Sequence, residues 1–380
     1  MGTTNGMPTR AIAILTLMLA LTACNDDPSA PSGGTPDPWN EVDLGAASAE
    51  PVRLVAIDCG TDDCIALGIE GAAPGGTSRF WEREADGLWT TRDDVGLPAV
   101  VYTGLALDDS GSAAFVGYDM RDMSSVVYDE RTPAPTSVSV ERSGLVTLDG
   151  DGDFFVAGGL LGGGHLVSSV SEGVWTRDDF PSSGRNDRGF WDVDVRGDVA
   201  VACGFDDGAD TLQVVLRRTR TTRWKALGRA GMPFGFDLRS IAVDDDGAIF
   251  VGGTVRPGSP AAEASAAVRS PTGEWTSLIL PDPTSLGRVN DILLAGDGSI
   301  YLACSSEYED TSIAYLLRVT ESGVQNEIAP FAGELLQLAE DGGGVIYAAG
   351  SRRTDGSPSR EPVLLRRSRR PGTGTVRNPL

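Results

Sequence analysis

The chain has 380 residues, enough for one large domain or two ordinary ones. Its formal net charge of −23 argues against binding to nucleic acid and against electrostatic docking on anionic lipid. The acidic surface suits solubility, or a partner that is basic or bridged by cations. With 41% hydrophobic residues the chain can build a core, and its 49 glycines and 22 prolines are typical of a fold with many tight turns.

The first 24 residues are typical of a targeting segment rather than of the fold. Arg10 precedes an apolar run, 11–21, that is too short to cross a bilayer as a helix. The run ends in Leu-Thr-Ala-Cys24, which resembles the bacterial lipobox, where a Cys after small residues is acylated and becomes the new first residue. The resemblance implies a lipoprotein signal peptide over 1–23. Ordinary secretory cleavage nearby, with Cys24 left free, is the alternative.

The lipobox implies a protein of the bacterial cell envelope that is anchored through acyl chains and not through a protein helix. Residue 25 is Asn rather than the Asp that resembles an inner-membrane retention signal, so we expect the outer membrane rather than the inner one. Residues 24–37 are rich in Pro, Gly, Ser and Asp, which predicts a lipidated Cys followed by a flexible tether. The folded unit is therefore expected over 38–380.

The segment from Arg239 to Pro281 predicts four short strands joined by three turns. Its first turn, Asp245-Asp246-Gly247, is of the Asp-Gly kind that favours tight hairpins, and Pro271-Thr272-Gly273 predicts the last turn. The unit is an antiparallel meander of about forty to fifty residues, the size of one β-propeller blade.

The same unit recurs along the chain, and in each copy the second strand closes on a small residue. These markers lie 41 to 51 residues apart, at Gly68, Gly117, Gly158, Cys203, Gly253, Cys304 and Gly350. Repeats of that period, built from strands of four to six residues, predict an all-β fold that is a single β-propeller with seven four-stranded blades.

A tryptophan opens the fourth strand in most copies, at Trp89, Trp175, Trp224 and Trp275. Its recurrence at one structural position favours packing between adjacent blades over stacking on a ligand. Trp39 has the same pattern but precedes the first blade, so we expect its segment to complete blade seven, whose third strand is predicted over 362–367. Such closure removes free sheet edges, and 374–380 is the rival outer strand.

The run from Arg288 to Tyr301, RVNDILLAGDGSIY, resembles the repeats of regulator-type and WD40/YVTN-like bacterial propellers. The resemblance covers most of the mature chain through turn and strand residues, and it implies the fold rather than an activity. The run Ser270-Pro-Thr-Gly273-Glu-Trp275 is weakly similar to the Asp box of sialidase-type propellers, but it lacks the Asp and is short.

Residues that could carry catalysis or bind a metal are sparse. His165 is the only histidine, in a predicted loop before the third strand of blade three, and no partner motif accompanies it. Asp149, Asp151 and Asp153 resemble the start of a calcium loop, but Leu160 stands where the glutamate is required, and a hairpin turn explains the acids. We therefore predict no cofactor, no metal site and no catalytic residue.

The cysteines divide by position. Cys59 and Cys64 flank Gly-Thr-Asp-Asp in the first hairpin of blade one, and in an oxidising envelope we expect a disulfide that pins this hairpin. Cys203 and Cys304 fall at equivalent markers in blades four and six. Because blade five lies between them, we expect two buried thiols and no bridge.

In propellers, ligands usually meet the loops that enter the innermost strands around the central channel. In this chain those entries combine arginines, aromatic groups and carboxylates, a plausible mouth for a ligand. The set is Arg188, Trp191, Arg239, Ser240, Arg288, Asn290, Asp291 and Glu334. The alternative is that they are solvated loop residues.

We therefore expect a monomeric, membrane-anchored propeller that serves as a non-enzymatic binding or scaffold module for an envelope protein or ligand. A carbohydrate-active enzyme, either a hydrolase or a lyase and sialidase-like, is the alternative, favoured by an acidic pair with an Arg at one mouth of the channel. A small-ligand sensor is a third hypothesis, in which Arg188, Arg239 and Arg288 turn inward together. No carboxylates are paired in the sequence at a spacing that identifies a general acid and base.

Overall fold

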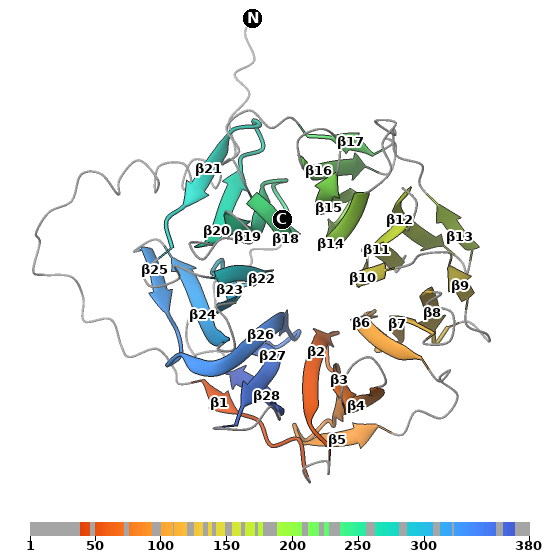
Figure 1. Cartoon of the computed structure of the whole chain (residues 1–380), viewed down its shortest axis with the longest axis vertical. Coiled ribbons are helices and arrows are strands. Elements are labelled where there is room, and N and C mark those ends of the chain that lie inside the picture. Colours follow the sequence, from red (N-terminus) through yellow and green to blue (C-terminus); the bar gives the residue numbers. More distant parts are fainter. Residues whose placement is uncertain are drawn as a thin grey trace, which may run out of the picture.

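The computed structural model describes the part of the chain that forms the blades. The described residues are 39–45, 50–71, 76–92, 100–108, 110–119, 125–131, 136–138, 142–148, 154–160, 164–171, 174–177, 188–206, 212–219, 224–227, 236–255, 263–280, 287–306, 312–320, 323–354 and 360–368. Within these ranges, 28 strands form seven antiparallel, four-stranded blades around a central axis (Figure 1). No helix in these ranges is long and apolar enough to span a bilayer.

In each blade the first strand lies nearest the central channel and the fourth strand lies at the outer edge (Figure 1). Blade one has β2 (Val52–Cys59), β3 (Cys64–Glu70), β4 (Thr77–Arg83) and β5 (Trp89–Arg92); blade two has β6 (Val101–Leu107), β7 (Ala113–Tyr118), β8 (Ser125–Asp129) and β9 (Thr136–Val138); blade three has β10 (Arg142–Leu148), β11 (Phe154–Leu160), β12 (Gly164–Ser171) and β13 (Val174–Arg177). Blade four has β14 (Arg188–Arg196), β15 (Val199–Asp206), β16 (Leu212–Thr219) and β17 (Lys225–Ala226); blade five has β18 (Phe236–Val243), β19 (Ile249–Val255), β20 (Glu263–Arg269) and β21 (Trp275–Leu278). Blade six has β22 (Gly287–Leu294), β23 (Ile300–Ser306), β24 (Ile313–Thr320) and β25 (Gly323–Asn326); blade seven has β26 (Phe331–Glu340), β27 (Ile346–Arg353), β28 (Arg360–Arg367) and β1 (Asn40–Glu41).

The ring is closed by the segment that follows Trp39, as its sequence pattern predicts. Strand β1 pairs antiparallel with β28, with Asn40 opposite Arg366 and Glu41 opposite Leu365. The pairing extends through Val42, whose N–H donates to the carbonyl of Leu364 at 2.8 Å. The first and last parts of the chain thus share one blade (Figure 1). The rival segment 374–380 lies outside the described residues.

The core lies between the blades. Each cluster of buried apolar side chains joins two neighbouring blades, and Trp89, Trp224 and Trp275 belong to three such clusters. The ring of Trp89 packs edge-on against Tyr347 of blade seven, with centroids 5.7 Å apart. Trp39 packs in the same way on Tyr301 of blade six, at 6.2 Å. The predicted role of these tryptophans in blade-to-blade packing is therefore confirmed where their side chains are described.

A recurring arginine completes two of these interfaces, and the sequence patterns did not predict it. Arg83, the last residue of β4, donates to the hydroxyl of Tyr347 at 2.8 Å and to a carboxylate oxygen of Asp341. Arg367, at the end of β28, donates to the hydroxyl of Tyr301. In both interfaces an arginine and a tryptophan of one blade contact a tyrosine of the blade before it.

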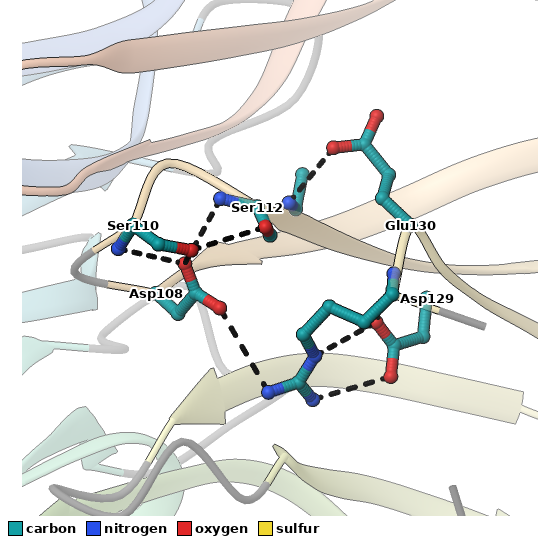
Figure 2. Close-up of polar contacts among 7 residues, drawn as sticks. Asp108, Ser110, Ser112, Asp129 and Glu130 are labelled. Carbon is teal, nitrogen blue, oxygen red and sulfur yellow. Dashed lines mark hydrogen bonds and ion pairs between the residues drawn. The ribbon is translucent and has the colours of Figure 1, made fainter.

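The hairpins between first and second strands are held by aspartates. Asp108 accepts hydrogen bonds from the N–H and hydroxyl of Ser110 and from the N–H of Ser112, at 2.9, 2.6 and 2.9 Å (Figure 2). Asp244 accepts from Ala248 N–H at 2.7 Å in blade five. Gly247 has φ +81°, as a glycine that ends a three-residue hairpin loop requires. The predicted turn Asp245-Asp246-Gly247 is thus confirmed as a three-residue loop, closed by the hydrogen bond from Asp244 N–H to the carbonyl of Ala248 at 3.0 Å.

The disulfide between Cys59 and Cys64 is present in the structure. The two residues face each other across the end of the β2–β3 hairpin, with Cα atoms 4.1 Å apart. The enclosed loop contacts blade seven, because Thr61 accepts a hydrogen bond from Gly342 N–H at 3.1 Å. The disulfide therefore pins a loop that lies where the ring closes.

The predicted equivalence of Cys203 and Cys304 is wrong by one residue. Cys304 pairs with Val289, just before a bulge in the inner strand, whereas Cys203 pairs with Asp192, just after one. Gly204 is the true counterpart of Cys304. The cause is the hairpin loop of blade four. Arg196 pairs directly with Val199, so this loop has two residues, whereas the equivalent loop of blade six has three. An alignment on the turn glycine is therefore displaced by one residue. Both thiols are free and buried, and they point to opposite sides of their blades.

Candidate functional site

The inner strands share a bulge that determines which side chain follows it. The register shifts by one residue at the same place in six of the described inner strands. The residues directly after the bulge are Ala56, Gly104, Asp192, Ser240, Asp291 and Gln337. Where this residue is long and polar, it reaches the neighbouring blade.

Asp192 shows the pattern. One of its oxygens accepts the N–H of Val193 at 2.7 Å, and the other accepts the N–H of Ile241, in the inner strand of the next blade, at 2.7 Å. Asp291 repeats this arrangement with Ile292 at 2.8 Å and with Leu338 of blade seven at 2.7 Å. These carboxylates satisfy buried backbone donors and join adjacent blades.

Gln337 occupies the same position in blade seven. Its side-chain oxygen accepts the N–H of Ile57 at 3.2 Å, so the contact that closes the ring here is neutral. Ser240 is too short for this role. Its side chain is fully buried, and its hydroxyl has no hydrogen-bond partner among the described residues. The channel thus has carboxylates at some blade junctions and not at others.

Two more aspartates lie two residues after the bulge position in their inner strands. Asp58 in β2 accepts the N–H of Leu107 at 2.8 Å, and Asp194 in β14 accepts the N–H of Val243 at 2.7 Å. In each pair the donor again belongs to the inner strand of the following blade. We call Asp58, Asp192, Asp194 and Asp291 the channel aspartates.

The channel aspartates line one cavity of about 140 Å³ at the centre of the propeller. Burial raises the pKa of Asp291 to about 7 and that of Asp58 to about 6, although backbone N–H groups favour their ionised forms. Burial, and then repulsion from Asp291, raises the pKa of Asp192 well above its ordinary range. Burial also raises the pKa of Asp194, against the attraction of Arg196. The site therefore attracts positive charge, whether protons or a cationic group.

The residues predicted for the channel mouth whose side chains the structure describes do not lie together in one site. Among those with described side chains, Asp291 alone lines the cavity. The guanidinium of Arg239 lies 4.1 Å from the ring centre of Trp191 and pairs with Asp237 at 2.8 Å. This group joins blade four to blade five. Trp191 and Arg239 each come before the residues of their own strand that line the cavity.

Two further groups lie at other blade junctions. Arg288 donates to the amide oxygen of Asn290 at 2.6 Å, and Asn290 donates to the carbonyl of Leu335 at 2.5 Å. Glu334 is buried, accepts from Ser351 at 3.2 Å, and pairs with Arg53 and Arg360. Arg239 and Arg288 each bind an acceptor on their own strand, so they do not turn to a common point.

Several predicted residues lie wholly or partly outside the description. Cys24 and Asp149, Asp151 and Asp153 are not among the described residues, and the side chain of Arg188 is not described. The expected loop position of His165 is wrong, because this residue lies within β12, which begins already at Gly164 opposite Leu160. Across the described ranges, no group of three or more His, Cys, Asp or Glu side chains is arranged to hold a metal ion.

The sequence reasoning missed Asp58, Asp192 and Asp194. Each is an acid with an apolar residue on either side of it in an inner strand, as in VRLVAIDC and FWDVDV. An alignment of the seven inner strands on their bulges, rather than on their turn glycines, would have brought Asp192 into one column with Asp291.

Neither a protein-family model nor a curated protein matches the sequence. Several solved structures are similar to this chain over most of its length. One, described as "YCF48 bound to D1 peptide", has 11% identity and a TM-score of 0.54, covering 88% of this chain and 98% of that chain. Another, "Structure of U3-55K", has 12% identity and a TM-score of 0.56, covering 87% and 98%.

A third similar structure is the β-propeller domain of the Trilobed protease from Pyrococcus furiosus, with 9% identity, a TM-score of 0.50 and coverage of 88% and 100%. At such identities the likeness shows the fold alone, and the chain is an all-β propeller. That domain is described as having an open velcro topology. In this chain, by contrast, β1 pairs with β28 and closes the ring.

Proposed function

We propose that the protein is a non-enzymatic binding propeller of the bacterial cell envelope, anchored by lipid on Cys24 with the outer membrane favoured, and that its channel receives a cationic side chain of a protein partner. The observation that carries the proposal is the cavity of about 140 Å³ that, among the residues the structure describes, is lined by four aspartates and one cation, Arg196. A lysine or arginine of a partner is the chemical group that such a cavity favours.

The overall charge supports the same partner chemistry. A net charge of −23 steers basic partners toward the propeller and repels acidic ones. One similar propeller was solved bound to a peptide, which makes peptide binding by this fold a useful analogy and nothing more. The lipid anchor would hold the propeller near partners in the envelope.

The test is in-cell crosslinking followed by affinity purification of the tagged full chain. Three variants accompany the wild type: Cys24→Ala, which removes the anchor; Asp192→Asn with Asp291→Asn, which removes two channel charges; and Asp245→Asn with Asp246→Asn, which removes two exposed hairpin charges. We expect a stoichiometric partner with the wild type and the hairpin variant, and its loss with the other two.

The purified partner then allows affinity to be measured. Removing one side of a desolvated charge pair typically costs about 2–5 kcal/mol, so the channel variant should bind roughly thirtyfold to several thousandfold more weakly. A partner that binds the channel variant as tightly as the wild type would refute the channel site. A partner captured equally by Cys24→Ala would refute the role of the anchor.

A carbohydrate-active enzyme is the second candidate, and the observation that favours it is the cluster of carboxylates with Arg196 in the channel, where burial raises the pKa of Asp291 to about 7. A carboxyl that holds a proton near neutral pH can act as a general acid. Against this role, both oxygens of Asp291 already accept backbone N–H groups. Hydrolysis or elimination of glycans by the wild type but not by Asp291→Asn would favour the enzyme over the binding module.

A further inference from the structure

The channel aspartates lie close to one another with little positive charge to balance them. Arg196 is the only cation that lines their cavity among the described residues. From the other elements that line it, β26 contributes the neutral Gln337, and β6 and β18 contribute apolar groups such as Leu105 and Ile241. Four ionised carboxylates with one guanidinium would leave a net charge of about −3 in a partly dehydrated space, which is unfavourable.

The same carboxylates hold the blades together. Asp58, Asp192, Asp194 and Asp291 each accept a hydrogen bond from the following blade, and the four donors are the N–H groups of Leu107, Ile241, Val243 and Leu338. These bonds join blade one to two, four to five and six to seven. A change in the charge of the channel aspartates therefore acts directly on three blade junctions.

We propose that the channel aspartates form a proton-dependent clamp on the ring: protonated carboxyls let the inner strands of neighbouring blades pack closely, and ionisation loosens the same junctions by repulsion. Ionisation also strengthens each carboxylate as a hydrogen-bond acceptor, so two effects compete. Burial prevails, joined for Asp58, Asp192 and Asp291 by repulsion from another channel aspartate, because the pKa values of all four carboxyls lie above their ordinary range.

The direction of the pH effect follows from these pKa values. An aspartate whose pKa is higher in the folded state than the ordinary 3.8 binds protons more tightly when the chain is folded. Its contribution to stability is complete below the unfolded pKa and is lost as the pH rises through the folded values, about 6 for Asp58 and about 7 for Asp291. Each extra bound proton changes the unfolding equilibrium roughly tenfold per pH unit.

The clamp does not depend on the proposed function. A cationic side chain in the channel would neutralise the carboxylates as protons do. Only this replacement of protons by a partner rests on the proposed function. The test therefore uses the full chain without any ligand. Failure of the clamp would leave partner binding open, and failure of partner binding would leave the clamp intact.

The experiment is amide hydrogen exchange at pH 5.5 and pH 8.0, corrected for the intrinsic effect of pH on exchange. The wild type is compared with Asp291→Asn and with Asp245→Asn, a matched loss of one negative charge at an exposed hairpin tip. In the wild type and in Asp245→Asn, the protection of 336–338 should fall about tenfold or more from pH 5.5 to pH 8.0. In Asp291→Asn the fall should be much smaller.

The wild type alone also decides the question if Asp291→Asn does not fold. A fall in protection confined to the inner-strand segments 105–107, 241–243 and 336–338 supports the clamp, with the outer strand β21 of blade five as internal reference. Equal protection at both pH values overturns the proposal. A fall of the same size in β21 also overturns it, because that result would reflect general charge repulsion.

Discussion

Aspartates accept backbone N–H groups in two regions of this propeller, and the two regions use them differently. Along the channel, Asp192 and Asp291 bind amides of the next blade. In the hairpins at the far end of the inner strands, Asp108 (Figure 2) and Asp341 bind amides of their own turn. The first set joins blades, and the second shapes the loops between strands.

The pKa values show what this difference means. Burial and neighbouring carboxylates raise the pKa of Asp291 to about 7. Partial burial alone would also raise the pKa of Asp108, but hydrogen bonds from Ser110 and Ser112, with the charge of Arg131, lower it below the usual value. Both aspartates accept backbone N–H groups, yet the pKa of Asp291 is raised and that of Asp108 is lowered. Burial and neighbouring charges, and not hydrogen bonds alone, therefore determine how unfavourable the ionised carboxylate is.

The largest expected effect comes from removing a channel acceptor. Asp291→Ala leaves the N–H groups of Ile292 and Leu338 without their acceptor, at about 1–3 kcal/mol each, so we expect a loss of about 2–6 kcal/mol in unfolding free energy. Asp291→Asn removes the charge but keeps only one of the two acceptor oxygens, and its NH2 group faces the other backbone N–H. At pH 8 it should therefore lose about 1–3 kcal/mol less than Asp291→Ala, because one N–H keeps its acceptor.

Urea denaturation at pH 8 measures both variants. Equal losses for Asp291→Ala and Asp291→Asn would mean that the charge itself, and not the acceptor, stabilises the junction. That result would contradict the view that ionisation of the channel carboxyls is unfavourable in the folded protein.

A turn aspartate should give a smaller effect with the opposite dependence on pH. Asp108→Ala removes a local cap, worth about 0.5–2 kcal/mol by analogy with helix caps. Because the folded pKa of Asp108 lies below the ordinary value, its contribution is present above the unfolded pKa and is lost as the pH falls through the folded one.

Thermal unfolding at pH 7 and pH 3 tests this prediction. The midpoints of wild type and Asp108→Ala should differ at pH 7, and the difference should shrink as the pH is lowered toward 3. The exposed Asp245, changed to Ala in the equivalent loop of blade five, serves as control. A difference that widens toward acid pH would show that Asp108 behaves like a channel aspartate.

The fold could be predicted from the sequence because its signals are local and repeat. The short strands and the small residue that closes the second strand mark every blade, the turn glycines and the tryptophans mark most of them, and Trp39 carried enough of that pattern to predict the closing strand. The equivalence of Cys203 and Cys304 failed where the repeat was not uniform. A hairpin shorter by one residue changes the register of all that follows, and the sequence shows it only once the pairing is known.

The candidate site could be predicted only in part, because it depends on contacts between blades. Asp291 was selected for its position near a strand entry, whereas Asp58 and Asp194 lie deeper in their strands. Glu334 and Arg239 have the chemistry of a binding site, but each is bound to neighbouring charged groups within the propeller. Composition identifies groups that can bind a ligand, and it does not show which of them the fold already uses.

The smallest expected effect concerns the backbone of a hairpin, where charge has no part. Gly298 in the β22–β23 loop has φ +83°, and a Cβ atom at this position would have open space around it. Gly298→Ala should therefore cost about 1 kcal/mol from backbone conformation alone. Gly296, in the same loop, serves as control: it does not have a positive φ, its Cβ position lies 3.4 Å from the nearest atom, and Gly296→Ala should be nearly neutral. Urea midpoints at pH 5.5 and pH 8.0 should show the same difference between the two variants at both values. A difference that changes with pH would mean that the hairpins and the channel are coupled, and that the two regions do not act separately.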